Sequence, residues 1–441
     1  MSPRARLFII LVMSTVAGCG GNGGDDAPPL LRSGPAATFH ISVSSTGAQG
    51  NSWSDGPSIS SDGRRVAFES AADNLVAGDT NGEMDVFVRD LARASTILVS
   101  VNSEGAPGDG YSHEPSISAD GRFVAFSSRA ANLVPGDENN HEDIFVRDLL
   151  AGTTVRVSVD SAGVEADCYS GHPSISGDGR YVAFESVATN LVAGDTNRAA
   201  DIFVRDLVAE TTVRVSVGPG GRQGDNACSN PAISSDGRHV AFESSATTLV
   251  EGDSNESTDV FRHDRVTGTT ERVSLGRSGA EGNLDSFSPA LSADGRRVVF
   301  ESLADNLVAG DTNQEADIFL RDLGEGTTLR VSVGVQDAES NGQSRGASIS
   351  SDGRIAAFRS FASNLVAEDT NGWADVFVRD LEAGTTTRIS VDSSGVQGNS
   401  GSHAPELAQG GRFVAFRSNS TTLSAGDTNG ESDVFVRGPI R

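Results

Sequence analysis

One tripeptide returns along this chain at a constant interval. Asp-Gly-Arg begins at residues 62, 120, 178, 236, 294 and 352, and a seventh copy has Gly410 in place of the aspartate. Each copy begins 58 residues after the one before it. A constant interval without insertion or deletion predicts one structural unit that is repeated seven times. The 441 residues therefore need not be divided into two or three average domains.

The sequence of one unit predicts four short strands. The first strand is 57–60 and the second is 65–70, and they are joined by an Asp-Gly dipeptide, which is favoured in tight hairpin turns. A longer loop leads to a third strand at 85–90, and a turn leads to a fourth at 96–101. The second and third strands contain continuous apolar triplets, which indicates burial on both faces. Four antiparallel strands per unit and no helical periodicity predict an all-β fold, the seven-bladed β-propeller.

The two ends of the chain complement each other. The last copy ends at Arg441 after its third strand, whereas residues 38–43 near the N-terminus match a fourth strand. We expect this N-terminal strand to complete the seventh blade, because the pairing closes the ring and removes an exposed sheet edge. The propeller is thus predicted to span residues 38–441.

The repeated motifs resemble those of the TolB-type propellers, a family related in shape to WD-repeat propellers. The matching stretches of the first unit are 57–60, 62–64, 66–68 and 85–91. The resemblance extends from about residue 38 to the end of the chain, and it implies the fold without specifying a function. TolB itself carries a separate N-terminal domain through which it joins the Tol–Pal envelope system, whereas a short tether precedes the ring here.

The first residues resemble a bacterial lipoprotein signal peptide. Arg4 and Arg6 form a basic region, and the apolar run that follows is too short to span a bilayer. The stretch 16–19, Val-Ala-Gly-Cys, resembles the lipobox, in which the peptidase cuts before a cysteine that is then lipidated. We predict a signal peptide at 1–18 and lipidation of Cys19. An ordinary secretory signal with a chance cysteine is the alternative.

Residues 19–37 are then the lipidated cysteine and a flexible tether that is rich in Gly, Pro and Asp. This arrangement places the protein in the bacterial cell envelope, attached to the membrane through the lipid alone. Glycine rather than aspartate after the lipidated cysteine favours the outer membrane, facing the periplasm or the surface.

The net charge of the chain narrows the classes of partner. A net charge of -26 argues against nucleic acid, because a phosphate-binding surface needs clustered lysine and arginine. An envelope protein, a peptide or a glycan is the expected partner.

Cys168 and Cys228 lie in neighbouring units, and an exported protein can form disulfides. These two residues form either a bridge or two buried thiols.

The loop before the third strand carries Asp79, Asn81 and Asp85 at its first, third and seventh positions, and every copy keeps this trio. We call these seven segments the Asp loops. Hard cations need several oxygen ligands from a tight turn, so the loops predict a calcium cofactor. The candidate ligands are Asp79, Asn81, Asp85, Asp195, Asn197, Asp201, Asp311, Asn313 and Asp317. The alternative is seven turns that cap themselves, because Asp and Asn side chains bond the backbone two residues on.

The positions that vary between units lie in the loop that leads into the first strand. The candidate ligand-binding residues there are Trp53, Asp55, Tyr111, His113, Tyr169, His172, Asn230, Phe287, Arg345 and His403. By topology these loops and the Asp loops share one face, around the mouth of the central channel. Aromatic and polar side chains supply stacking and hydrogen bonds to ligands, so we predict binding at this rim. The three histidines are interpreted as surface residues rather than as a zinc site.

The sequence contains no nucleophile elbow, HExxH motif, phosphate loop or recognisable Ser/His/Asp trio. The leading hypothesis is a non-catalytic envelope scaffold that presents one propeller face to its partner. Two alternatives stay open: a calcium-stabilised surface or adhesion module, and a carbohydrate-active lyase or hydrolase with its site at the channel mouth.

Overall fold

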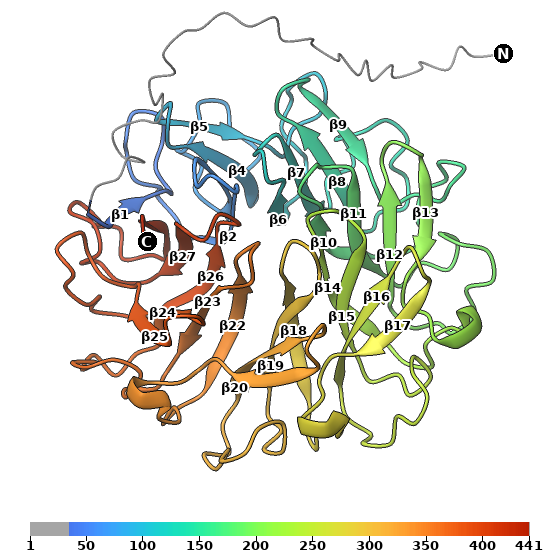
Figure 1. Ribbon diagram of the computed structural model, residues 1–441. Helices are drawn as coiled ribbons and strands as arrows, with labels where there is room; N and C mark the ends of the chain where they lie inside the picture. The colour runs from blue at the N-terminus through green and yellow to red at the C-terminus, as the bar shows by residue number, and fades with distance from the viewer. Residues whose placement is uncertain (1–34, 441) are drawn as a thin grey trace, which may run out of the picture.

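The computed structural model describes residues 35–440 and places them in a ring of seven blades (Figure 1). Each blade is a sheet of four antiparallel strands, and the sheets follow one another around the ring in chain order. The seven-bladed β-propeller predicted from the repeat is confirmed. The predicted signal peptide at 1–18, Cys19 and most of the tether lie outside the described residues.

The strands repeat at the same four places in each blade. The innermost strands are β2 (Ser54–Ile59), β6 (Ser112–Ile117), β10 (Ser170–Ile175), β14 (Cys228–Ile233), β18 (Ser286–Leu291), β22 (Ser344–Ile349) and β26 (Ser402–Leu407). The second strands are β3 (Arg65–Ser70), β7 (Phe123–Ser128), β11 (Tyr181–Ser186), β15 (His239–Ser244), β19 (Arg297–Ser302), β23 (Ile355–Ser360) and β27 (Val414–Ser418). The third strands are β4 (Asp85–Asp90), β8 (Asp143–Asp148), β12 (Asp201–Asp206), β16 (Asp259–Asp264), β20 (Asp317–Asp322), β24 (Asp375–Asp380) and β28 (Asp433–Gly438). The outer strands are β5 (Ser95–Leu98), β9 (Thr153–Arg156), β13 (Thr211–Arg214), β17 (Thr269–Arg272), β21 (Thr327–Arg330), β25 (Thr385–Arg388) and β1 (Ala37–His40).

Helix is limited to three short 3-10 turns within the described range 35–440. They are η2 (Pro219–Gly221), η3 (Arg277–Gly279) and η4 (Val335–Asp337). No helix in that range is long and apolar enough to cross a membrane.

Three predicted strands have other bounds in the structure: the first strand, the outer strand and the N-terminal strand, which is Ala37–His40 rather than 38–43. The first strand begins at Ser54 rather than Pro57, because a β-bulge between Asp55 and Ser58 carries the strand past the proline, which has no N–H for the ladder. The outer strand ends at Leu98, because the Ser100 hydroxyl then turns to bond a side chain of the third strand.

The N-terminal strand closes the ring as predicted. β1 pairs antiparallel with β28, with Phe39 opposite Val436, so the last sheet has the order β1-β28-β27-β26. The first strand therefore lies beside the last ones in Figure 1. The Thr38 hydroxyl donates to the carbonyl of Val391 at 2.6 Å, and the matching threonine of each other blade makes the same bond to the blade before it.

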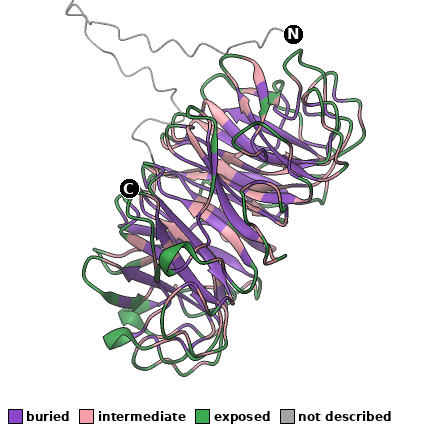
Figure 2. Ribbon diagram, turned by 90° about the vertical axis from the view of Figure 1, so that its right-hand side faces the viewer, coloured by how far each residue is buried: buried purple, intermediate pink, exposed green. Residues whose placement is uncertain are grey.

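The core lies between blades rather than inside one of them. In residues 35–440 the buried apolar side chains form seven clusters, each shared by two neighbouring blades. Figure 2 shows the burial running along the strands, with the exposed residues at the loops. Phe68 and Phe87 stand opposite each other on the second and third strands, with ring centroids 5.8 Å apart, and the other blades repeat this pair. Continuous apolar triplets on these strands are therefore buried on both faces.

Cys168 and Cys228 are both free thiols, so the structure contains no bridge between them. Cys228 is buried as expected, whereas Cys168 is only half-buried. The Cys228 thiol lies 3.3 Å from the Ser244 hydroxyl, where the other blades have a serine pair such as Ser54 and Ser70. Cysteine thus replaces a buried serine with a thiol of similar size.

We expect Ile41→Ala to lower the free energy of unfolding by about 2–4 kcal/mol, the usual cost of a core cavity of this size. Ile41 follows β1, is fully buried and packs in the cluster between blades 7 and 1. Urea unfolding measures the change, and Val396→Ala at an exposed position is the control, with an expected change within about 0.5 kcal/mol. Equal effects of the two substitutions would mean that the N-terminal segment does not hold the ring together.

Candidate functional site

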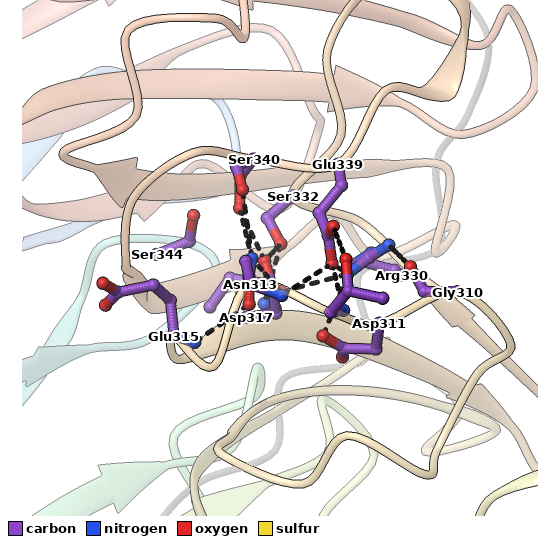
Figure 3. A network of polar contacts seen from close by, with 12 residues as sticks. Gly310, Asp311, Asn313, Glu315, Asp317, Arg330, Ser332, Glu339, Ser340 and Ser344 are labelled. Carbon is purple, nitrogen blue, oxygen red and sulfur yellow. Dashed lines mark hydrogen bonds and ion pairs between the residues drawn. The ribbon is translucent and has the colours of Figure 1, made fainter.

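The Asp loops surround buried aspartates, as the close view of blade 5 shows (Figure 3). Asp317 is fully buried and accepts hydrogen bonds from the Ser332 hydroxyl at 2.5 Å and from Asn313 Nδ2 at 3.0 Å. Asn313 Oδ1 accepts the backbone N–H of Glu315, two residues on, at 2.9 Å. This is the self-capped turn that the sequence left open as an alternative, and all seven copies of the asparagine form it.

An arginine of the outer strand lies among the carboxylates of the same loop. Arg330 Nη1 lies 3.3 Å from Asp311 Oδ1, 3.2 Å from Asp317 Oδ2 and 2.8 Å from Glu339 Oε1. These three carboxylates are spaced closely enough to hold a metal ion, as are Asp137, Asp143 and Glu165 of blade 2. In blade 2 the guanidinium of Arg156 has the same position. A guanidinium thus supplies the positive charge that these loops need.

The arginines at the ends of the outer strands compensate the negative charge of the Asp loops. Burial raises the pKa of Asp311 to about 6, and the charge of Asp317 adds to this, while Arg330 opposes it. The sequence contains the signal, because an arginine stands at the end of five outer strands. These arginines were not predicted as partners of the Asp loops. The calcium hypothesis for these loops stays a prediction.

The predicted rim residues lie at or just before the starts of the innermost strands, and each is half-buried. The innermost strands of neighbouring blades contact one another around the channel. The structure divides the rim side chains into an acidic sector, centred on blades 1 to 3, and a basic sector in blades 6 and 7.

The acidic sector is a network of histidines, tyrosine and glutamates. His113 Nε2 lies 2.8 Å from Glu142 Oε1, and the Tyr111 hydroxyl donates to Glu142 Oε2 at 3.1 Å. His172 Nδ1 lies 3.1 Å from Glu114 Oε1, so both histidines face glutamates. Burial lowers the pKa of His113, but the hydrogen bond and charge of Glu142 outweigh burial and raise the pKa above its ordinary value. The two histidines are therefore partners of carboxylates.

Four other rim candidates have individual surroundings. Burial, and then the charge of Glu114, raises the pKa of Tyr169, which keeps its hydroxyl protonated. Asn230 Nδ2 donates to Glu243 Oε1 at 2.8 Å. Trp53 and Phe287 are half-buried apolar surfaces at the starts of the first strands of blades 1 and 5.

A second set of residues at the mouth was missed by the sequence analysis. It is one column of the second strands, made up of Glu69, Ser127, Glu185, Glu243, Glu301, Arg359 and Arg417. The glutamates connect blades: Glu69 Oε2 accepts the backbone N–H of Glu114 at 2.8 Å, and Glu301 Oε1 accepts that of Gly346 at 2.6 Å. Variation at the third position of the Ala-Phe-Glu-Ser stretch, whose phenylalanine and serine recur in every blade, was the signal that could have found them.

The basic sector consists of Arg345, Arg359, His403 and Arg417. In the strand register Arg345 stands opposite Arg359, and His403 stands opposite Arg417. Arg359 Nη1 lies 3.0 Å from His403 Nδ1. Burial lowers the pKa of His403 to about 4, and the charges of Arg417 and Arg359 add to this. The imidazole is therefore neutral at pH 7, and the positive charge belongs to the three arginines.

Carboxylates of neighbouring blades neutralise the basic sector only in part. Arg417 pairs with Asp55, and Arg345 Nη1 lies 4.0 Å from Glu301 Oε2. Arg359 has no ion pair with any residue in the described part of the chain, and it is half-buried. The sector can therefore accept one more negative group.

Glu406 lies further along the first strand of blade 7, at a column that is serine in four other blades. Those serine hydroxyls accept the backbone N–H of the next blade, as Ser348 does from Leu407 at 2.9 Å. Burial raises the pKa of Glu406 to about 7. The carboxyl is thus a proton donor or acceptor close to neutral pH, beside the basic sector in the same strand.

Two open hollows lie at the opposite face of the ring. They are lined by the repeated Asp-Gly-Arg turns and by the turns after the third strands, including Arg64, Asp90, Asp322 and Arg354. Because these residues recur from blade to blade and pair with one another, the hollows follow from the repeat and do not form an individual site.

No protein-family model and no curated protein matches this chain. Solved structures match it as a fold. An oligogalacturonate lyase in complex with manganese is 12% identical, with 92% of this chain and 96% of that chain covered at a TM-score of 0.53. The β-propeller domain of the Trilobed protease from Pyrococcus furiosus is 13% identical, with 87% and 95% covered at a TM-score of 0.51. TolB from Acinetobacter baumannii is 14% identical, with 85% and 77% covered, and its TM-score of 0.40 is too low to carry an argument. The propeller fold implied by the resemblance to the TolB type is confirmed.

We expect Arg330→Met to destabilise the protein by about 3–5 kcal/mol at pH 7, because three carboxylates lose the charge that compensates them. The loss should shrink toward pH 5, where the carboxylates can take up protons instead. Urea unfolding at the two pH values measures both effects. Arg64→Met at an exposed turn is the control, and a loss as small as that of the control would show that Arg330 does not neutralise the loop.

We expect Glu406→Gln to stabilise the protein above pH 7. The folded-state pKa of Glu406 is about 7, against an ordinary value of 4.5, so the stability that the neutral acid contributes is complete below pH 4.5 and is lost as the pH rises through 7. Glutamine keeps the neutral state, with an expected gain of about 1–3 kcal/mol at pH 8. Thermal unfolding from pH 4.5 to 8.5 measures it, with exposed Glu104→Gln as control. Parallel curves for Glu406→Gln and the parent would contradict the shift.

Proposed function

We propose that this protein is a non-catalytic binding scaffold of the cell envelope and that its basic sector binds a carboxylate group of the partner. The observation that carries the proposal is Arg359, a half-buried guanidinium without an ion pair in the described residues, between two further arginines. The lipid anchor at Cys19 and the outer-membrane location belong to the same proposal.

The arrangement of the arginines supports an anionic partner. Like charges directly opposite each other in a sheet are destabilising, and Arg345 stands opposite Arg359. Burial lowers the pKa of Arg359, the charge of Glu301 opposes this shift, and the charges of Arg345 and Arg417 add to it. An anion bound there offsets both costs. Arginine is also suited to the task, because its planar fork binds a carboxylate through two parallel hydrogen bonds.

The negative net charge of the chain makes the basic sector selective for acidic ligands. With a net charge of -26, most of the surface repels an acidic ligand, so an acidic ligand is directed toward the one part of the mouth where positive charges gather. The acidic sector across the rim adds hydrogen-bond acceptors and the ring of Tyr111. A ligand with one carboxylate and several hydroxyl groups fits both sectors.

An acidic glycan meets this description, and a peptide with a free carboxylate meets part of it. One similar structure is an oligogalacturonate lyase, and each galacturonate unit carries a carboxylate and hydroxyl groups. That likeness is one of fold and supports only the choice of probe. We therefore take oligogalacturonate as the first probe and an acidic peptide as the second.

A lyase is the second candidate function. His403 is neutral at pH 7 and lies next to Arg359, so an imidazole base would stand beside a group that can neutralise a uronate carboxylate. Incubation of the protein with oligogalacturonate, with the ultraviolet absorbance of the unsaturated product as readout, separates a lyase from a scaffold.

We expect Arg359→Gln and Arg417→Gln each to weaken binding of the acidic probe at least tenfold, which is about 1.4 kcal/mol. Isothermal titration calorimetry at two salt concentrations measures the affinity, and an uncharged oligosaccharide is the control ligand. Arg64→Gln, on the opposite face, is the matched control variant. Unchanged affinity in the Arg359→Gln and Arg417→Gln variants, or equal binding of the uncharged oligosaccharide, would move the site away from the basic sector.

A further inference from the structure

In six of the seven blades, within the part of the chain that the structure describes, a side-chain N–H group from outside the Asp loop lies between the two aspartates of that loop. The bridging residues are Arg156, Arg214, Arg272, Arg330, Arg388 together with Gln397 of the same blade, and Gln49. The nitrogen atoms lie 2.8 to 3.7 Å from the carboxylate oxygens of the first and seventh loop positions. In each of these blades a donor therefore stands between two carboxylates.

Blade 1 has both aspartates and lacks both kinds of donor. Leu98 stands at the column of the arginines, and Pro107 stands at the column of the glutamine. Neither side chain carries an N–H group. Asp85 retains its bonds to Ser100 and to Asn81, as in the other blades. The bridging position between Asp79 and Asp85 thus has no protein donor in this blade.

The buried carboxylate of Asp79 differs in its contacts from the equivalent carboxylates of the other Asp loops. It is only 8% exposed, and among residues 35–440 no hydrogen bond or ion pair reaches its side chain. A buried carboxylate beside another one is costly unless a proton or a cation compensates it. The equivalent aspartate of each of the six other blades has a partner within the protein. The exception in blade 1 therefore indicates a partner from outside the chain.

We propose that blade 1 binds a calcium ion between Asp79 and Asp85, at the position that an arginine nitrogen takes in blades 2 to 6. Carboxylate oxygens are the ligands that calcium prefers, and calcium tolerates irregular geometry. Gly78 and Thr80 on either side of Asp79 are exposed, so water can complete the coordination. Two protein carboxylates predict weak binding, with a Kd on the order of 10⁻⁴ to 10⁻³ M.

This proposal is independent of the proposed ligand site. The calcium site lies between the third and outer strands of blade 1, whereas the basic sector lies on the inner strands of blades 6 and 7. The sequence predicted calcium ligands in the loops of blades 1, 3 and 5 equally, and the proposal reduces these three candidate sites to the one in blade 1. In blades 3 and 5, Arg214 and Arg330 of the outer strands already occupy the bridging position.

Equilibrium dialysis of the full chain against radioactive calcium, with a chelator control, tests the proposal. We expect one ion per chain and a melting temperature that rises with calcium concentration. Asp79→Asn should abolish both effects. Asp195→Asn in blade 3 is the matched control and should leave the stoichiometry at one.

The substitution Leu98→Arg gives a second test that does not depend on loss of a ligand. Five other blades have arginine at this column, so the new guanidinium should enter the position between Asp79 and Asp85. We expect Leu98→Arg to raise the melting temperature without calcium and to abolish calcium binding. No bound calcium in the parent chain would overturn the proposal in favour of a protonated Asp79. Binding that persists in the Leu98→Arg and Asp79→Asn variants would overturn it in favour of another loop.

Discussion

Each blade of this protein has two apolar faces, and a single four-stranded sheet cannot bury either face by itself. The clusters therefore form between blades, as in the one that joins Val66 and Phe68 of blade 1 to Val434 and Val436 of blade 7. An open ring would leave two such faces in water. Closure by β1 prevents this, because the strand pairs with β28 while Ile41 enters the last cluster. The rest of the structure depends on this mutual burial.

The polar groups that recur in every blade serve the same packing. A buried aspartate such as Asp85 needs hydrogen-bond partners, and Ser100 and Asn81 supply them in a uniform way. The donor that bridges the two aspartates is less uniform: it is an arginine in blades 2 to 6, joined by Gln397 in blade 6, and Gln49 in blade 7, while Leu98 of blade 1 offers no N–H group. Repetition thus determines the scaffold, and the places where the repeat changes are where individual chemistry becomes possible.

The sequence predicted the scaffold well and the site in part. The interval of 58 residues predicted seven blades, and the unmatched strand at residue 38 predicted the closure. The start of the first strand was predicted wrongly, because a β-bulge at Asp55 is not visible as a pattern of apolar residues. The rim histidines were found by their variation between blades, but the glutamates they face, such as Glu142 of the neighbouring third-strand loop, were not.

The sequence by itself determined the number of blades, the strand order within a blade and the turns, because these depend on local periodicity and on residues that recur. Only the tertiary structure decided which charges meet. Arg359 contacts His403 from 44 positions away in the chain, and Arg330 reaches Asp317 from 13 positions away. Such distances are set by the register between strands and by the packing of one blade on the next. The electrostatic character of a site is a sum over side chains from several blades, so it exists only once the ring has closed.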